Sequence, residues 1–75
     1  MHFEIIVTNG CCPLVYMCTT MHEAYECIDT LAQGLLAGVD IDLDLIMKTL
    51  VDMAYGSTIG FSGNMFAIAY REGEV

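Results

Sequence analysis

The residues best suited to chemistry in this sequence are its cysteines, because thiolates bind metal ions and act as nucleophiles. They are Cys11, Cys12, Cys18 and Cys27, and His22 would add a further zinc-type ligand. No two of the cysteines have C-x-x-C spacing, however, and a buried cysteine commonly behaves as a small hydrophobic residue. We therefore favour structural thiols and assign no metal ligands. A thiol-based metal-binding or redox protein that uses these four cysteines is the alternative.

Nucleophilic catalysis has little support in the sequence. Cys18 and His22 have the residue types of a thiol enzyme, but no oxyanion loop or signature motif accompanies them. The stretch from Gly56 to Gly60 contains no lysine and precedes a predicted strand, whereas a phosphate-binding loop opens a helix. We assign no catalytic residue and no cofactor, and we expect a non-enzymatic protein.

Three aspartates at alternate positions resemble the start of a calcium-binding loop. Asp40, Asp42 and Asp44 match its D-x-D-x-D opening, but the next position is Leu45 and the twelfth is Val51. An EF-hand loop requires glycine and glutamate at these two positions. Helix capping and solvation explain the aspartates better than a calcium site does.

A group of polar residues on one predicted helix is the remaining candidate site. Glu23, Glu26 and Asp29 recur at helical spacing, with Gln33 beyond them, so all four belong to the polar side of that helix. A solvated helix face explains this pattern, and a docking surface for a basic partner is the functional alternative. We take these four residues as candidate partner-binding residues.

The composition limits the class of partner. Two basic residues against ten acidic ones give a formal net charge of −8, which repels the phosphates of nucleic acids. We therefore expect a protein partner with a basic surface and no direct nucleic-acid binding. No basic segment precedes an apolar run at the N-terminus, and no apolar run approaches the ~18 residues of a membrane span. We expect a cytoplasmic protein with reduced thiols that does not enter membranes.

The chain is short and rich in apolar residues. Its 75 residues suffice for one domain, 1–75, in which 72–75 form a frayed tail. The hydrophobic fraction is 56% without glycine, against roughly 45–50% with glycine in ordinary domains. Because so small a domain cannot bury all these side chains alone, we expect an apolar surface shared between copies, in a homodimer or a larger homo-oligomer.

The clearest predicted element is an amphipathic helix from Thr20 to Gly38. Between residues 21 and 36, the apolar side chains fill one half of the helical wheel and the remaining residues fill the other. Thr20 and Glu23 form a capping-box pattern, in which each side chain accepts from the backbone N–H of the other residue. Gly38 would end the helix in the left-handed conformation.

A second helix is predicted from Asp42, its N-cap, to Gly56, which ends it. Ile41 and Ile46 occupy the two positions of a hydrophobic staple at its start. Because only residues 39–41 connect the two helices, they should be antiparallel neighbours.

Strands are predicted on both sides of the helical pair. The first hairpin joins His2–Thr8 to Leu14–Thr19 through a five-residue loop, Asn9–Pro13, because a shorter loop would place proline in the partner strand. The second hairpin spans Ser57–Arg71, with Gly63-Asn64 as its two-residue turn.

The second hairpin has two unequal faces. In its predicted register Phe61 faces Phe66 and Ile59 faces Ile68, and Tyr70 extends this bulky face, which should pack on the helices. The opposite face carries small residues that would let another backbone approach closely. The candidate self-association residues on this face are Thr58, Gly60, Met65, Ala67 and Ala69.

The element order β-β-α-α-β-β predicts an α+β fold, with two antiparallel helices on one face of an antiparallel sheet built from two hairpins. The two hairpins either join in one four-stranded sheet or pair with a second chain, and the sequence leaves both arrangements open. The expected function is a small acidic interaction module that self-associates and acts as adaptor, regulator or inhibitor of a basic partner. An inhibitor of this kind would compete with nucleic acid for a basic groove.

Overall fold

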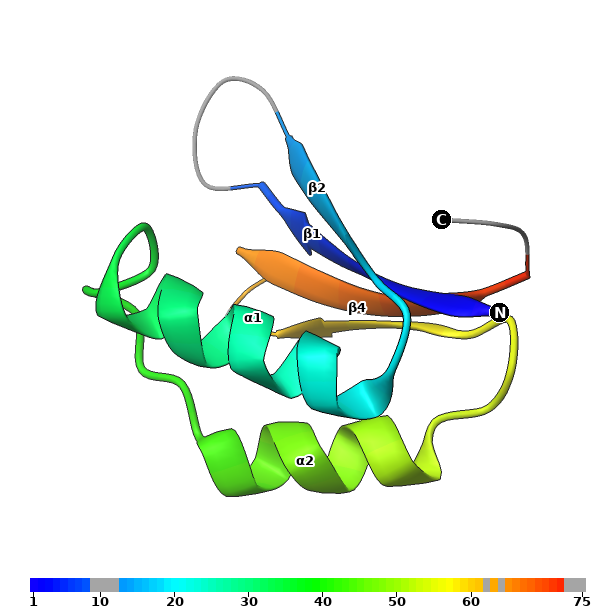
Figure 1. Ribbon diagram of the computed structural model, residues 1–75. Helices are drawn as coiled ribbons and strands as arrows, with labels where there is room; N and C mark the ends of the chain where they lie inside the picture. Colours follow the sequence, from blue (N-terminus) through cyan, green and yellow to red (C-terminus); the bar gives the residue numbers. More distant parts are fainter. Residues whose placement is uncertain (9–12, 62, 64, 73–75) are drawn as a thin grey trace.

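The computed structural model describes residues 1–8, 13–61, 63 and 65–72 of the chain (Figure 1). Its elements are β1 (His2–Val7), β2 (Leu14–Cys18), α1 (Met21–Gln33), α2 (Leu43–Asp52), β3 (Thr58–Phe61) and β4 (Phe66–Arg71). The predicted order β-β-α-α-β-β and the α+β class are confirmed. No helix in the described part of the chain has the length and apolar character needed to cross a bilayer.

One four-stranded antiparallel sheet contains both hairpins, in the order β2-β1-β4-β3. The two central strands join the hairpins, because β1 pairs with β4 from His2 opposite Arg71 to Val7 opposite Phe66. The strands β2 and β3 therefore form the two edges. Both helices lie on one face of the sheet and run in opposite directions (Figure 1).

The first hairpin pairs Val7 with Leu14 and Phe3 with Cys18. Its predicted strands are confirmed to within a residue at their ends, but residues 9–12 of the predicted loop lie outside the described residues. The second hairpin has the predicted register, with Phe61 opposite Phe66. Gly63 in its turn has a φ of 66°, the left-handed region that favours glycine. The predicted tail, 72–75, is described only at Glu72.

The core lies between the sheet and the helices. Alternate residues of the central strands point to the helices, as a period of two requires, and the predicted bulky face is part of this layer. Aromatic rings reinforce it: Phe3 stacks on Tyr70 with ring centroids 4.5 Å apart, and Phe61 stacks on Phe66 at 5.1 Å. The largest fully buried side chains are Val7, Ile5, Ile28, Leu36, Ile46, Leu50, Phe66 and Ile68.

The predicted start of α1 is confirmed and its predicted end is wrong. The Thr20 hydroxyl accepts from the backbone N–H of Glu23 at 3.0 Å, as a capping residue does. The helix ends at Gln33, and Gly38 does not have a positive φ. Residues 34–38 form turns in which the Leu36 N–H donates to the Leu31 carbonyl at 2.7 Å. These turns bury Leu36 as a longer helix would. Hydrophobic periodicity therefore did not distinguish a helix that continues to Gly38 from a helix followed by turns.

The start of α2 also agrees with prediction. The Asp42 carboxylate accepts from the backbone N–H groups of Asp44 and Leu45, at 3.1 and 3.2 Å. The helix ends at Asp52, four residues before the predicted Gly56, because Met53 adopts an extended backbone with ψ of 141°. Gly56 has a φ of 84° and its N–H donates to the Tyr70 carbonyl. This glycine therefore directs the chain into β3 and does not cap the helix.

Candidate functional site

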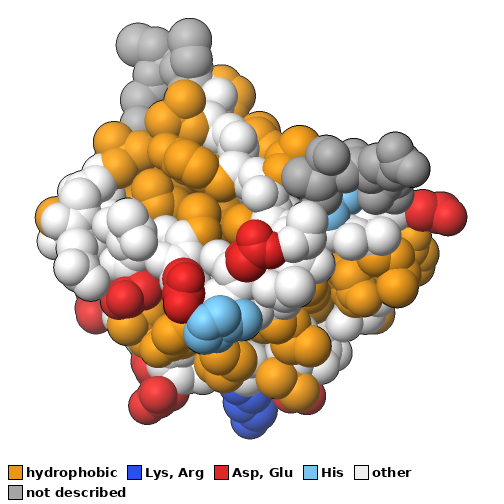
Figure 2. All heavy atoms as spheres, in the orientation of Figure 1, with side chains coloured by type: hydrophobic (Ala, Val, Ile, Leu, Met, Phe, Trp, Pro, Cys, Tyr) orange, Lys and Arg blue, Asp and Glu red, His pale blue; other side chains and the backbone are white. Residues whose placement is uncertain are grey.

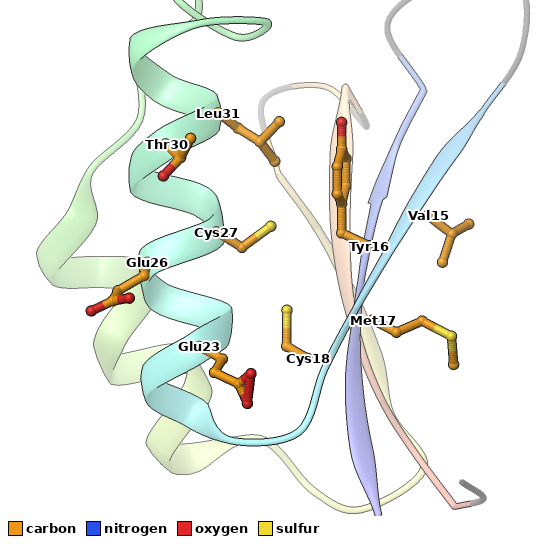
Figure 3. Close-up of a pocket in the computed structure, with 9 residues that line it drawn as sticks. All are labelled: Val15, Tyr16, Met17, Cys18, Glu23, Glu26, Cys27, Thr30 and Leu31. Carbon is orange, nitrogen blue, oxygen red and sulfur yellow. The ribbon is translucent and has the colours of Figure 1, made fainter. Parts of the chain in front are cut away.

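A groove with a volume of about 670 Å³ separates β2 from α1. Figure 3 shows the residues that line it, and Figure 2 shows an apolar hollow on this face of the molecule with acidic side chains beside it. The strand contributes Val15, Tyr16, Met17 and Cys18, and the helix contributes Glu23, Glu26, Cys27, Thr30 and Leu31. The side chains of Val15 and Met17 point away from α1, so these two residues border the groove at the open edge of β2 (Figure 3). This groove brings together thiols and carboxylates that the sequence suggested for separate functions.

The short connection between β2 and α1 builds the groove. Only Thr19 and Thr20 separate the last residue of β2 from the first residue of α1, so the helix folds back immediately along the strand. The hydroxyl of Thr19 donates to the Glu23 carboxylate, and Thr20 caps the helix. Cys27, four positions after Glu23, then points toward β2, whereas Glu26 lies at the outer rim of the groove and points away from the strand (Figure 3).

Two of the cysteines, Cys18 and Cys27, are neighbours in the groove. Cys18 is buried and Cys27 half-buried, and Figure 3 shows their sulfur atoms pointing toward each other. Burial, together with the neighbouring Cys27 and a hydrogen bond to it, raises the pKa of the Cys18 thiol to about 11. Burial also raises the pKa of Cys27. Both shifts disfavour the thiolate that redox chemistry or metal ligation requires.

The alternative function, a metal-binding or redox protein, was predicted to use four cysteines, and two of them fall outside the part of the chain that the structure describes. Cys11 and Cys12 lie outside the described residues. Within the described ranges, no group of three or more histidine, cysteine or acidic side chains is arranged to hold a metal ion.

The four candidate partner-binding residues divide into two pairs. Glu23 and Glu26 line the groove, and the exposed Glu26 carboxylate lies 2.7 Å from the exposed His22 imidazole. Asp29 and Gln33 lie outside the groove lining, where the Gln33 amide donates to the Asp29 carboxylate at 3.4 Å. Helical spacing placed all four on the polar side of α1, but only the first pair is next to β2.

The candidate self-association residues lie on the sheet face opposite the helices or at its end. Thr58 and Gly60 are exposed, and Ala67 is half-buried. Met65 lies in the hairpin turn, where its carbonyl accepts from the Thr8 N–H. Ala69 is fully buried in the single chain and offers no surface to a partner.

This far face of the sheet has an uncharged end and a charged end. The pairing register aligns Val15, Ile6, Ala67 and Gly60 in one row across the four strands. At the other end, the Glu4 carboxylate contacts the His2 imidazole at 2.8 Å and the Arg71 guanidinium at 3.1 Å. The hydrogen bond from His2 and the charge of Arg71 outweigh burial and lower the pKa of Glu4.

Sequence reasoning assigned no role to His2, and it missed this ion cluster. The spacing of His2 and Glu4 on one strand predicts a common face, but Arg71 joins them only through the pairing of β1 with β4. That pairing links residues near the two ends of the chain, and no local pattern predicts it.

The exposure of β2 was also missed. Leu14, Val15, Tyr16 and Met17 are between 36% and 53% exposed, although their sequence is typical of a buried strand. Nothing in this local sequence indicates that the strand occupies an edge of the sheet.

Comparison with known proteins gave no relative from which a function could be transferred: no protein-family model, no curated protein and no solved structure matches this chain.

Proposed function

We propose that this protein is a small acidic, non-enzymatic interaction module, which regulates or inhibits a partner that has a basic surface. The observation that carries the proposal is the groove between β2 and α1. It combines an exposed apolar strand with two carboxylates, Glu23 and Glu26, on its helical wall.

Charge and apolar surface have separate roles in this proposal. The net charge of −8 attracts a basic partner from a distance and accelerates encounter. The exposed side chains of β2 supply apolar area that leaves water on binding. A partner whose basic surface holds nucleic acid would be blocked by the same contact, which makes competition with nucleic acid a form of inhibition.

Two charge reversals test the assignment of the groove. Glu26→Lys alters the groove wall, whereas Asp29→Lys makes the same change in net charge on the same helix outside it. A partner captured from the native host by the unmodified chain should associate more slowly with both variants, and more slowly with Glu26→Lys than with Asp29→Lys. Raising the salt concentration should reduce the difference, since the screening length is about 8 Å at physiological ionic strength. Equal association rates for all three proteins would refute the role of the acidic groove.

Self-association is a second part of the proposal, and the uncharged row of the far sheet face favours it. Val15 and Met17 on this face are 53% and 46% exposed, and Gly60 at the other end of the row is exposed. We infer that two copies pack through this face, because its small side chains permit close approach.

Light scattering at micromolar concentration tests the second part. A dimer or larger assembly is expected for the unmodified chain. Ala67→Glu should weaken it, because a carboxylate that loses water without gaining a partner is costly. Ala69→Glu is not a suitable test, since Ala69 is buried in the monomer. A monomer throughout the concentration range would contradict self-association.

A further inference from the structure

We propose that the partner supplies an extended basic segment, which pairs with the edge strand β2 as a fifth strand and places basic side chains beneath Glu23 and Glu26. This inference rests on the proposed function and specifies how the acidic groove binds.

The backbone of β2 has hydrogen-bonding groups directed away from the sheet. The Thr8 N–H donates to the Met65 carbonyl on the β4 side, and backbone direction alternates along a strand. Phe3, Ile5 and Val7 of β1 therefore direct their N–H and C=O groups toward β2, where Leu14, Tyr16 and Cys18 lie opposite.

The same alternation turns Val15 and Met17 outward. Their two N–H and two C=O groups face the open edge, and no strand among the described residues pairs with that side of β2. This row of groups is the template that an added strand requires.

From Leu14 to Cys18, within the described residues, the edge has few of the usual obstacles to strand addition, although Pro13 directly precedes it. Proteins protect edge strands with charged side chains, proline, bulges or a covering loop. The segment Leu14–Cys18 contains no charged residue, glycine or proline, and its first four side chains are exposed. An extended segment can therefore reach it.

The side chains of the groove select a basic segment. An added strand would project alternate side chains toward the helices, beside Tyr16 and Cys18 and under the wall of α1. Lysine and arginine fit this position because their aliphatic stems can lie along Leu31 and the Tyr16 ring while their charged ends reach Glu23 or Glu26. Glu23 points toward the β2 side of the helix, whereas Glu26, whose side chain is 64% exposed, lies at the outer rim of the groove and points away from β2 (Figure 3).

A second copy of the chain fits the edge poorly. Antiparallel pairing of two β2 strands would place both α1 helices on the same face of one continuous sheet, and would bring like charges at Glu23 and Glu26 together. The basic residues of the chain are remote from the groove lining: Lys48 lies on α2, and Arg71 is bound to Glu4. Charge complementarity therefore favours a foreign basic segment.

The probe for this inference is a fluorescently labelled peptide of about eight alternating lysine and valine residues, long enough to pair along a short strand. Its affinity for the unmodified protein is measured by fluorescence anisotropy, with a glutamate–valine peptide as the control. We expect the lysine peptide to bind and the glutamate peptide not to bind. Glu26→Lys should weaken binding about tenfold, whereas Asp52→Lys, the same charge change on α2, should weaken it much less.

Two methylated versions of the peptide test strand pairing without altering the protein. In an antiparallel fifth strand, the peptide residues that form hydrogen bonds with Val15 and Met17 have their side chains on the same face as these two residues, away from the helices. In the lysine–valine peptide, these residues are the valines. N-methylation of the valines removes those N–H donors and should weaken binding about tenfold or more, whereas N-methylation of the lysines should have little effect.

Val15→Pro tests the same contact from the protein side. It removes an outward N–H and leaves the bonds between β2 and β1 in place, so it should weaken binding about tenfold while circular dichroism shows an unchanged fold.

Three results would overturn the inference. If the two methylated peptides bind equally while Glu26→Lys still weakens binding, the acidic surface acts without strand pairing, and the proposed function survives. If Val15→Pro abolishes a dimer of the protein that Ala67→Glu leaves intact, a second copy occupies the edge. If the lysine peptide binds no better than the glutamate peptide, the edge does not select basic segments, and the association rates with the native partner decide the proposed function separately.

Discussion

The two edges of the sheet differ in how they meet solvent. On β2 the side chains from Leu14 to Met17 are exposed on both faces of the strand. On β3 exposure alternates: Thr58 and Gly60 are exposed, whereas Ile59 and Phe61 are half-buried against the core. The charged residues Lys48 and Asp52 line a hollow together with Ile59, so the β3 edge has charged side chains beside it.

This difference separates two requirements that edge strands face. A protected edge prevents unwanted pairing, and β3 meets this requirement through its four-residue length and the nearby charges of α2. An open edge permits pairing, and β2 provides one. Because both edges belong to one small sheet, the contrast indicates that the exposure of β2 is a property of that strand's surroundings and not a general looseness of the fold.

The largest expected effect tests whether the two edges share one cooperative unit. Ile68→Ala removes a fully buried side chain from β4, opposite both Ile5 and Ile59, and should cost about 2–5 kcal/mol of unfolding free energy. Both hairpins should lose protection from hydrogen exchange together. Retained protection in the first hairpin alone would show that the edges belong to separate units.

The next effect tests the direction of the β2 backbone. Tyr16→Pro removes an N–H that faces β1 and leaves the Ile5 carbonyl without its donor, which should cost about 1–3 kcal/mol. Val15→Pro should cost less than this, since its N–H faces solvent. Denaturant midpoints of the two variants compare them directly, and a larger loss for Val15→Pro would reverse the assignment of inward and outward residues.

The helix starts were predictable because their signals are local. Thr20 and Asp42 bond to residues two or three positions away, and such contacts form wherever the segment is placed. The turn at Gly63 and the pairing of Phe61 with Phe66 are local for the same reason. The end of α1 was not predictable, because Leu36 is buried by turns as it would be by a helix.

The features that define the candidate site depend on distant contacts. Glu23, Glu26 and Cys27 were each recognised as notable, but their alignment with β2 follows from how the helix folds back over the sheet. The edge position of β2 follows from the pairing of β1 with β4. That pairing joins residues between 59 and 69 positions apart, from Val7 opposite Phe66 to His2 opposite Arg71. Periodicity within either segment contains no information about it.

A smaller effect compares the helices that lie beside the two edges. Thr20→Ala removes the cap of α1 beside β2, and Asp42→Ala removes the cap of α2 near β3; each should cost about 1 kcal/mol. Losses of similar size in thermal unfolding are expected, with the Asp42 carboxylate accepting from two backbone N–H groups and the Thr20 hydroxyl from one. An unchanged midpoint for Thr20→Ala would show that α1 does not depend on this cap.

The pH dependence of stability tests the thiol pair, Cys18 and Cys27, which lies on the β2 side of the core among the described residues. The folded-state pKa of Cys18 is raised from 9.0 to about 11 by burial, and that of Cys27 is raised in the same direction. The unfolded chain therefore loses these protons at lower pH than the folded chain does. Stability from this source is fully present below about pH 9 and declines as the pH rises toward 11.

Urea unfolding at pH 8 and at pH 10 measures this decline, and Cys18→Ala provides the matched control. The unmodified chain should lose more stability between the two pH values than Cys18→Ala does, because the variant has no buried thiol at this position to keep protonated. Tyrosine and lysine ionisation affects both proteins alike and cancels in the comparison. The same decline in both proteins would mean that Cys18 is accessible to solvent in the folded state. The Cys18 and Cys27 thiols would then not pack together tightly enough to exclude water from the groove beside β2.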